Sequence, residues 1–557
     1  MASVVGKRVG GRTYYYLAES ARVRGEPRIV SQRYLGSADD IAAAVRARPG
    51  GAPVDSTHLA FGDVAAGWRV LTDLGLPDLV DGIVGRQRAE VSAGTYLALA
   101  VLHRLVAPGS ETGLAAWWPT TAAPRFVRPR LPAAALERRR VRRALGRLAG
   151  GHREDIEAAL LVRVRNELGS HGPSLVLDLP GFATFLDGTN PHADADPSPH
   201  GDRGPRARMA GLAVVVTLDG AVPLVARSYQ HLRGDDTSFP ALTAELTDRF
   251  RAALGGDTPL TVVTGADQAA PQNHAGGPHF VGPLPSSEHP DLIAARLTVP
   301  RAVNPAHLPG VTALDGRARV AGVDRRVIRV HSTNLQAAQT RALAQDLAHA
   351  TRRLDELASA LRLGVVDRPR AEIAAEVARI ARFRWSDRVL STRLDRTSGG
   401  GLTLTWHVDE RAYARLRSEL FGKQLLTTDH DDWSVPQVIT AYRARYHLES
   451  TLTHLGGPLV PAPTPAWRWT DDDVEVHGLV TVLATTVAHL MRRRAQRVGL
   501  DLSVRELFRR LADVEETRLR YPSTGGRPRT RHVLAEHGDT ARSLVDLFDL
   551  TAYAPRS

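Results

Sequence analysis

The segment AYRARYHLESTLTHL, near residue 440, contains a tyrosine, an arginine and a glutamate at helical spacing. Side chains of these three types can act on a phosphodiester. On a helix, Arg445 lies about 60° and Glu449 about 20° from Tyr442 around the axis. A guanidinium can clamp a phosphate, and a carboxylate can hold a divalent metal ion. Tyr442, Arg445 and Glu449 are therefore candidate site residues. The alternative for the two charges is an intrahelical ion pair, which contributes only a few tenths of a kcal/mol.

A second candidate carboxylate, Asp178, ends the short apolar run SLVLD. An acidic residue at the end of an early strand and another on a late helix are the arrangement by which a ribonuclease-H-like fold gathers carboxylates. Such a cluster holds two divalent ions about 4 Å apart, one activating the attacking oxygen and one stabilising the leaving oxygen. Mg²⁺ favours oxygen ligands and keeps several waters, so two or three carboxylates suffice.

The composition favours a polyanionic partner. The 557 residues carry 72 basic and 60 acidic side chains, a formal net charge of +12, and nearly all the positive charge is arginine. Nucleic acid is the partner that this charge fits best. The absence of cysteine excludes disulfides and thiolate metal sites and fits a reducing cytoplasm. No signal-peptide core and no apolar run long enough to cross a bilayer is present, so we expect a cytoplasmic protein without a membrane partner.

The periodicity of apolar residues divides the chain into six segments. We expect a small basic β-unit, then a helical region that is a candidate for DNA binding, then an α/β core whose mixed sheet is interrupted by a β-rich and helical insertion. The helix that carries Glu449 should begin near Val435, with Ser434 as its cap and Pro436 in its first turn. The expected segments are 1–60, 61–172, 173–294, 295–425, 426–495 and a helical tail, 496–557.

The order of several fragments along nearly the whole chain resembles the DDE transposases of bacterial insertion sequences. Tyr442, Arg445 and Glu449 match the first three members of the signature Tyr-x2-Arg-x3-Glu-x6-Lys that marks one group of this family. The other matching fragments are YYYLAESARVRGEPR, SLVLD with FATFL, RSYQHLRGDDTSF, FVGPLPSSEHPDLI, LFGKQLLTTDHDDWS and WRWTDDDVEVHGLVTVLA.

This resemblance implies a ribonuclease-H-like catalytic domain that cleaves DNA at transposon ends and then joins a 3′-hydroxyl to target DNA. It implies two Mg²⁺ or Mn²⁺ ions as cofactor, and double-stranded DNA as partner, bound by a homodimer. Asp178 occupies the position of the first catalytic Asp and Glu449 that of the catalytic Glu. Tyr442 and Arg445 are expected near the terminal phosphates.

The sequence departs from the family pattern at three places. Residues 179–181 are Leu-Pro-Gly where relatives have Thr-Asn after the first Asp, and Gly456 replaces the signature Lys. The second catalytic Asp should stand eight residues before Asn273, but that position is Gly265. Asp267, two residues further on, would lie about 6–7 Å away on the same face of an extended strand. We therefore take Asp267 as the candidate third metal ligand, although a preorganised site tolerates a displacement of only about 0.5 Å.

Two functions from different classes remain open at this point. One is an active transposase, from which a nuclease of the same fold without strand transfer is not distinguishable by sequence. The other is a catalytically inactive DNA-binding protein derived from a transposase, which Gly265 and Gly456 favour. Three further readings are open as well. They concern whether Tyr14–Tyr16 grip DNA or pack on a sheet, whether the arginines of 138–143 are solvated or contact phosphate, and whether Trp433, Trp467 and Trp469 fill the core.

Overall fold

The computed structural model forms two compact units. Unit 1 comprises residues 1–152, 462–464 and 490–557, and unit 2 comprises 153–461 and 465–489. The structure describes residues 2–9, 12–23, 26–39, 41–42, 53–85, 91–109, 113–148, 151–169, 174–185, 207–230, 238–254, 260–265, 278–294, 301–304, 308–320, 322–365, 368–396, 401–456, 471–522, 530–535 and 538–555. Within these residues, none of the helices combines the length and apolar character that a membrane span requires.

Unit 1 contains two small antiparallel sheets. The first is the N-terminal meander of β1 (Ala2–Val9), β2 (Arg12–Val23) and β3 (Glu26–Ser37), in the region expected to be β-rich. The second joins distant parts of the chain: β4 (Asp55–Ala60) pairs with β16 (Glu515–Arg520), which pairs with β17 (Thr530–Leu534). The C-terminal tail, expected to be helical, thus contributes two strands to unit 1.

Helices form the rest of unit 1, in agreement with the helical periodicity of residues 65–170. Leu97, Leu99, Val101 and Leu102 of α4 are fully buried, because the helix is apolar on all sides and packs against α2, α3 and α7. The helical elements are α2 (Gly62–Asp73), α3 (Leu76–Val84), α4 (Ala93–Val106), α5 (Leu114–Trp117), η2 (Trp118–Thr120), α6 (Ala123–Phe126), η3 (Ala133–Leu136), α7 (Arg138–Leu145), η4 (Gly146–Leu148), α17 (Val504–Ala512), α18 (Asp539–Leu547) and η7 (Leu550–Tyr553).

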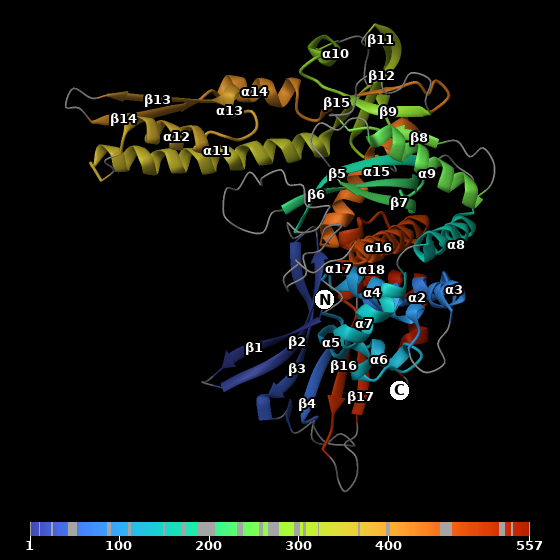
Figure 1. Cartoon of the computed structure of the whole chain (residues 1–557). Helices are drawn as coiled ribbons and strands as arrows, with labels where there is room; N and C mark the ends of the chain where they lie inside the picture. Colours follow the sequence, from blue (N-terminus) through green and yellow to red (C-terminus); the bar gives the residue numbers. More distant parts are fainter. Residues whose placement is uncertain are drawn as a thin grey trace. The chain divides into compact units, whose positions relative to one another are not determined.

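Unit 2 is built on a large mixed sheet, shown in Figure 1. In the described residues its strand order is β10-β11-β12-β15-β9-β8-β5-β6-β7. The strands are β5 (Ser174–Phe185), β6 (Ala207–Thr217), β7 (Pro223–Gln230), β8 (Leu260–Val263), β9 (His279–Leu284), β10 (Arg301–Ala302), β11 (Val311–Val320), β12 (Val323–Ser332) and β15 (Lys423–Thr428).

The directions of these strands define the fold class. Strands β5, β6 and β7 form an antiparallel meander, whereas β8 runs parallel to both β5 and β9. Strands β15, β12, β11 and β10 continue from β9 in antiparallel order. The predicted mixed-sheet α/β fold is confirmed. A meander whose first strand is followed by parallel neighbours is the ordering expected of a ribonuclease-H-like core.

The helices that pack against this sheet come from several separate parts of the chain. Helix α9 contacts β5, β6 and β7, and α15 contacts β5, β8 and β9. A buried carboxylate, Glu157 on α8, pairs with Arg249 on α9 and with Arg153. The helices are α8 (Gly151–Leu168), α9 (Ser238–Leu254), α10 (Pro290–Ala294), α15 (Val435–His454) and α16 (Asp471–Arg497), whose residues from 490 on belong to unit 1.

Between β12 and β15 the chain forms a helical insertion with a hairpin, and Figure 1 shows α11 alongside that hairpin. It consists of α11 (Thr333–Arg362), α12 (Arg370–Ile380), α13 (Ser386–Val389), β13 (Leu390–Arg396), β14 (Leu402–Val408) and α14 (Glu410–Glu419). The insertion has cores of its own. One joins Leu354 of α11 to Ile373 of α12 and Leu404 of β14. The predicted insertion, residues 295–425, is thus only partly an insertion: its β-rich first part, β10 to β12, extends the main sheet, and residues 333–419 form the helical part with the hairpin.

Candidate functional site

The helix that carries the candidate site begins where the sequence predicts. Helix α15 starts at Val435, directly after Ser434, and Pro436 lies in its first turn. The side-chain Oε1 of Gln437 accepts a hydrogen bond from the backbone N of Ser434 at 2.8 Å and another from its Oγ at 2.7 Å. The first of these hydrogen bonds satisfies the backbone N–H of Ser434 at the start of the helix, where backbone N–H groups lack intrahelical partners.

The turn before α15 is fixed by Trp433 and by a partly buried arginine. The ring of Trp433, 7% exposed, stacks on His430 at a centroid distance of 3.9 Å and belongs to the core under the sheet. Arg326 of β12 donates from Nη1 to the carbonyl oxygens of His430 and Trp433, and its Nη2 pairs with Asp315. The interpretation of Trp433 as a core residue is thus confirmed. Trp467 and Trp469 lie outside the described residues.

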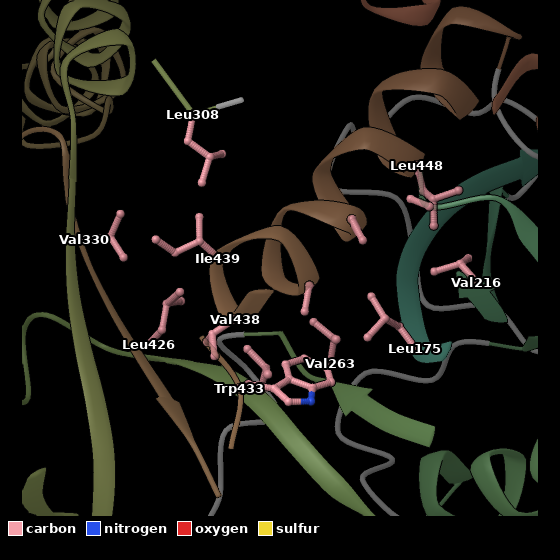
Figure 2. Close-up of a cluster of buried hydrophobic side chains, with 14 of the residues drawn as sticks. Leu175, Val216, Val263, Leu308, Val330, Leu426, Trp433, Val438, Ile439 and Leu448 are labelled. Carbon is pink, nitrogen blue, oxygen red and sulfur yellow. The ribbon is translucent and has the colours of Figure 1, made fainter. Parts of the chain in front are cut away.

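One stripe of α15 is apolar and packs onto the sheet. Figure 2 shows Val438, Ile439 and Leu448 of the helix facing the same core as Leu175 of β5 and Val263 of β8. Each of these five side chains is 1% exposed or less. Burying side chains of this size contributes about 1.5–3 kcal/mol each, so the packing holds the position of α15 over the sheet.

The polar stripe of Tyr442, Arg445 and Glu449 borders this apolar stripe. Tyr442 packs against the edge of the core, while the side chains of Arg445 and Glu449 are 18% and 42% exposed. The Nε of Arg445 donates to Oε1 of Glu449 at 2.9 Å. The three residues share a face, as predicted, and the intrahelical pair is formed. Intrahelical pairs at i and i+4 contribute about 0.2–0.5 kcal/mol, so a metal ion or a phosphate can displace either partner of this partly exposed pair.

Burial perturbs two groups on this helix. Burial raises the pKa of the Tyr442 phenol. The positive charge of Arg445 lowers this pKa and the negative charge of Glu449 raises it, but burial has the largest effect. Burial lowers the pKa of the neighbouring Arg443. Tyr442 therefore stays protonated at neutral pH, and its hydroxyl can donate a hydrogen bond to an anionic oxygen.

Asp178 lies within a strand rather than at its end. Strand β5 continues from Ser174 to Phe185, and Asp178 pairs with Ala213 of β6. The strand reads as shorter in the sequence because Pro180 and Gly181 interrupt the apolar run. In the structure these two residues coincide with a register shift between Leu179 and Phe182. Proline is accommodated at such irregularities because it has no N–H for the ladder.

The register of β5 and β8 relates Asp178 to the position of the missing second Asp. The last parallel pair is Leu177 with Val263, where β8 ends, so the residues that follow on the two chain segments are Asp178 and Thr264. Neighbouring strands are about 4.8 Å apart. Position 178 is therefore level with Thr264, and the buried Gly265 is one residue further along the chain. The side chain of Asp178 and all of Asp267 lie outside the described residues.

Gly456, which stands where the resemblance leads us to expect a lysine, lies just after the end of α15. Helix α15 ends at His454, and Gly456 follows its cap with φ +83°. L-residues with side chains rarely adopt this left-handed conformation, whereas glycine does so readily at helix ends. The position seven residues after Glu449 thus lies beyond the helix, and a lysine there would be strained.

The described residues contain no group of three His, Asp or Glu side chains placed to hold a metal ion. Of the three predicted ligands, the structure describes the side chain of Glu449. One carboxylate oxygen of Glu449 accepts the hydrogen bond from Arg445. A metal site at Asp178, Asp267 and Glu449 therefore stays a prediction.

Sequence reasoning missed a polar cluster where β15 leads into α15. His430 Nε2 contacts Thr261 Oγ1 at 2.8 Å and its ring stacks on that of His279 at 4.3 Å, while His279 Nδ1 lies 3.2 Å from Asp429. Burial lowers the pKa of His430. The run TTDHDDW was the available signal. Thr261 and His279 lie near the N-terminal ends of β8 and β9, whereas Gly265 follows the C-terminal end of β8. The cluster is therefore at the other end of these strands from Gly265.

Comparison with known proteins identifies no family. No protein-family model and no curated protein matches this chain. Among solved structures, the chain is similar to the piggyBac transposase in a synaptic complex with hairpin DNA, at 8% identity and a TM-score of 0.31, with 82% of each chain covered. A similarity at this TM-score does not establish a common fold or function.

Proposed function

We propose that this chain is a DDE-type, transposase-like protein that cleaves DNA at insertion-sequence ends and transfers the strand to target DNA. One observation carries the proposal. The residues matching the family signature lie on one face of α15, and α15 packs onto β5, the strand that contains Asp178. The Arg445–Glu449 pair occupies the edge of that packing, where a phosphate backbone has access to it.

Each site residue has a proposed role. Asp178, Glu449 and, in place of the missing second Asp, Asp267 are the proposed ligands of Mg²⁺ or Mn²⁺. Bound ions of this kind lower the pKa of an attacking water and neutralise charge on the phosphoryl oxygens. Arg445, released from its weak pair, is placed to clamp a phosphate, and the protonated Tyr442 to donate to one. The proposed partner is double-stranded DNA, held by a homodimer.

A second candidate function is a transposase-derived DNA-binding protein without catalysis. The observation that favours it is Gly265, which occupies the position expected for the second catalytic Asp and has no carboxylate. Under this alternative the fold and its basic surface bind DNA, and Asp267 does not replace the missing ligand.

The experiment that separates the two candidates is a cleavage assay. Purified protein is incubated with plasmid that carries the DNA flanking its gene, with Mg²⁺, with Mn²⁺ or with EDTA, and nicks are mapped on denaturing gels. An active transposase produces nicks at a defined position with a free 3′-hydroxyl, and only with metal. DNA binding without nicks under any metal condition would refute catalysis and support the second candidate.

A further inference from the structure

Helix α7 of unit 1 carries the most concentrated positive charge that the structure describes. Residues 125–147 contain nine arginines and one carboxylate, Glu137, a net charge of +8 against +12 for the whole chain. Five of these arginines lie on the eight residues of α7. The proposed chemistry at α15 uses none of them.

The arginines occupy the whole outer surface of α7. Val141 and Leu145, at 1% and 4% exposure, form its buried face, and α7 contacts α4 through this side. Around the helix axis, Arg139 and Arg143 lie about 160° from Val141 in either direction, so they form the crest of the exposed side. All five arginines of the helix are exposed.

The anchoring of α7 makes this surface rigid. Directly after the helix, Leu148 is fully buried, and Arg147 donates to the carbonyl oxygens of Val84 and Gly85 at 3.4 Å each. Before it, the hydroxyl of Tyr96 donates to the carbonyl oxygen of Ala135 at 2.7 Å. Because the backbone of α7 is held by a packed core and by hydrogen bonds at both ends, binding orders only the exposed arginine side chains.

The charge arrangement is unfavourable for the helix alone. Arg138 and Arg142, and Arg139 and Arg143, are like-charged pairs at i and i+4, which destabilise a helix. The first turn contains three arginines, which the helix dipole disfavours, and the single carboxylate at this end is that of the N-cap residue, Glu137. An anionic partner removes both penalties, because its phosphates neutralise the guanidinium groups.

We propose that the arginine face of α7, residues 138–143, is a binding surface for the phosphate backbone of duplex DNA. This inference rests on the proposed function, which supplies the identity of the polyanion. B-form DNA presents one negative charge per about 1.7 Å of helix axis and a major groove wide enough for an α-helix. The deep, narrow major groove of duplex RNA does not admit side chains in this way.

The test compares the double variant Arg139→Gln/Arg143→Gln with a matched control, Arg411→Gln/Arg415→Gln, which removes the same charge at the same spacing from exposed positions of α14. Binding of a labelled DNA duplex is measured by fluorescence anisotropy at 50–200 mM salt. Each lost phosphate contact reduces the slope of log K against log salt by about 0.9. We expect the α7 variant to lose about 2 in slope and on the order of tenfold in affinity, and the control to behave like wild type.

Two further arms make the outcome specific. Arg139→Lys/Arg143→Lys keeps the charge and should retain most of the affinity, and all variants should melt within a few degrees of wild type, since the substituted side chains are exposed. An unchanged slope in the α7 double Gln variant, with a wild type that binds DNA, would overturn this surface and leave the proposed function standing. A wild type that binds no duplex would overturn both. A duplex RNA of the same sequence that binds as tightly, with the same sensitivity to the variant, would overturn DNA as the partner.

Discussion

A buried carboxylate at the start of α2 makes the stability of unit 1 depend on pH. Asp63 is 7% exposed, and its Oδ1 accepts a hydrogen bond from the backbone N of Val64 at 2.8 Å. Burial raises the pKa of Asp63 from 3.8 to about 6, with a smaller contribution from the charge of Glu515, while backbone hydrogen bonds oppose the shift. The desolvation cost therefore outweighs the favourable position of an acidic group in the first turn of a helix.

The sign and size of the effect follow from the two pKa values. Because the folded-state pKa exceeds the unfolded one, the contribution of Asp63 is fully present below pH 3.8 and is lost as the pH rises through about 6. Above pH 7 the loss is about 3 kcal/mol, since one pKa unit corresponds to about 1.4 kcal/mol. The neutral isostere in Asp63→Asn should thus gain stability relative to wild type as the pH rises from 4 to 8.

Thermal melting of both proteins at matched pH values measures this gain. For a unit of this size, about 3 kcal/mol corresponds to about 6–12 °C in the melting temperature of its transition. A control, Asp539→Asn, alters the first turn of α18 in the same unit, where the side chain is 98% exposed, and should show little pH-dependent difference. A difference between Asp63→Asn and wild type that stays constant from pH 4 to pH 8 would refute the reasoning.

Two further predictions test the packing that positions the elements. Leu448→Ala, which removes a side chain 1% exposed between α15 and the sheet, should cost about 2–5 kcal/mol, whereas Glu449→Gln next to it should cost at most about 0.5 kcal/mol; equal melting temperatures of the two variants would contradict the placement of α15. Gly94→Ala should destabilise unit 1, because the new Cβ would lie 2.0 Å from the carbonyl oxygen of Pro77. Gly82→Ala in α3, whose new Cβ would have no neighbouring side chain or packed element within 4 Å, should instead stabilise unit 1 by up to about 1 kcal/mol in denaturant titrations.

The elements around the candidate site were predictable because their signals are local. Ser434, Pro436 and the apolar positions of α15 specify where that helix begins and which side is buried, and the apolar runs of β6 and β8 specify strands. The strand pair β4–β16 gave no such signal. Its sequences, DSTHLA and EETRLR, are polar and mostly exposed, and their pairing joins residues more than 450 positions apart.

The candidate site itself was predictable only in part. The shared face of Tyr442, Arg445 and Glu449 follows from helix geometry, but the hydrogen bond between Arg445 and Glu449 depends on rotamers that spacing does not determine. Asp178 was expected at the end of a strand that in fact continues past the irregularity at Pro180. The role of Gly456 as a left-handed residue after α15 becomes visible only once the helix end is known.

The most direct test of the central claim is the plasmid-nicking rate of Glu449→Gln with Mg²⁺ or Mn²⁺. The matched control is Glu356→Gln, an exposed carboxylate on α11. If Glu449 is a metal ligand of a transposase site, Glu449→Gln abolishes nicking while DNA affinity and melting temperature remain those of wild type, and Glu356→Gln nicks normally. Nicking by Glu449→Gln at the wild-type rate would contradict the account.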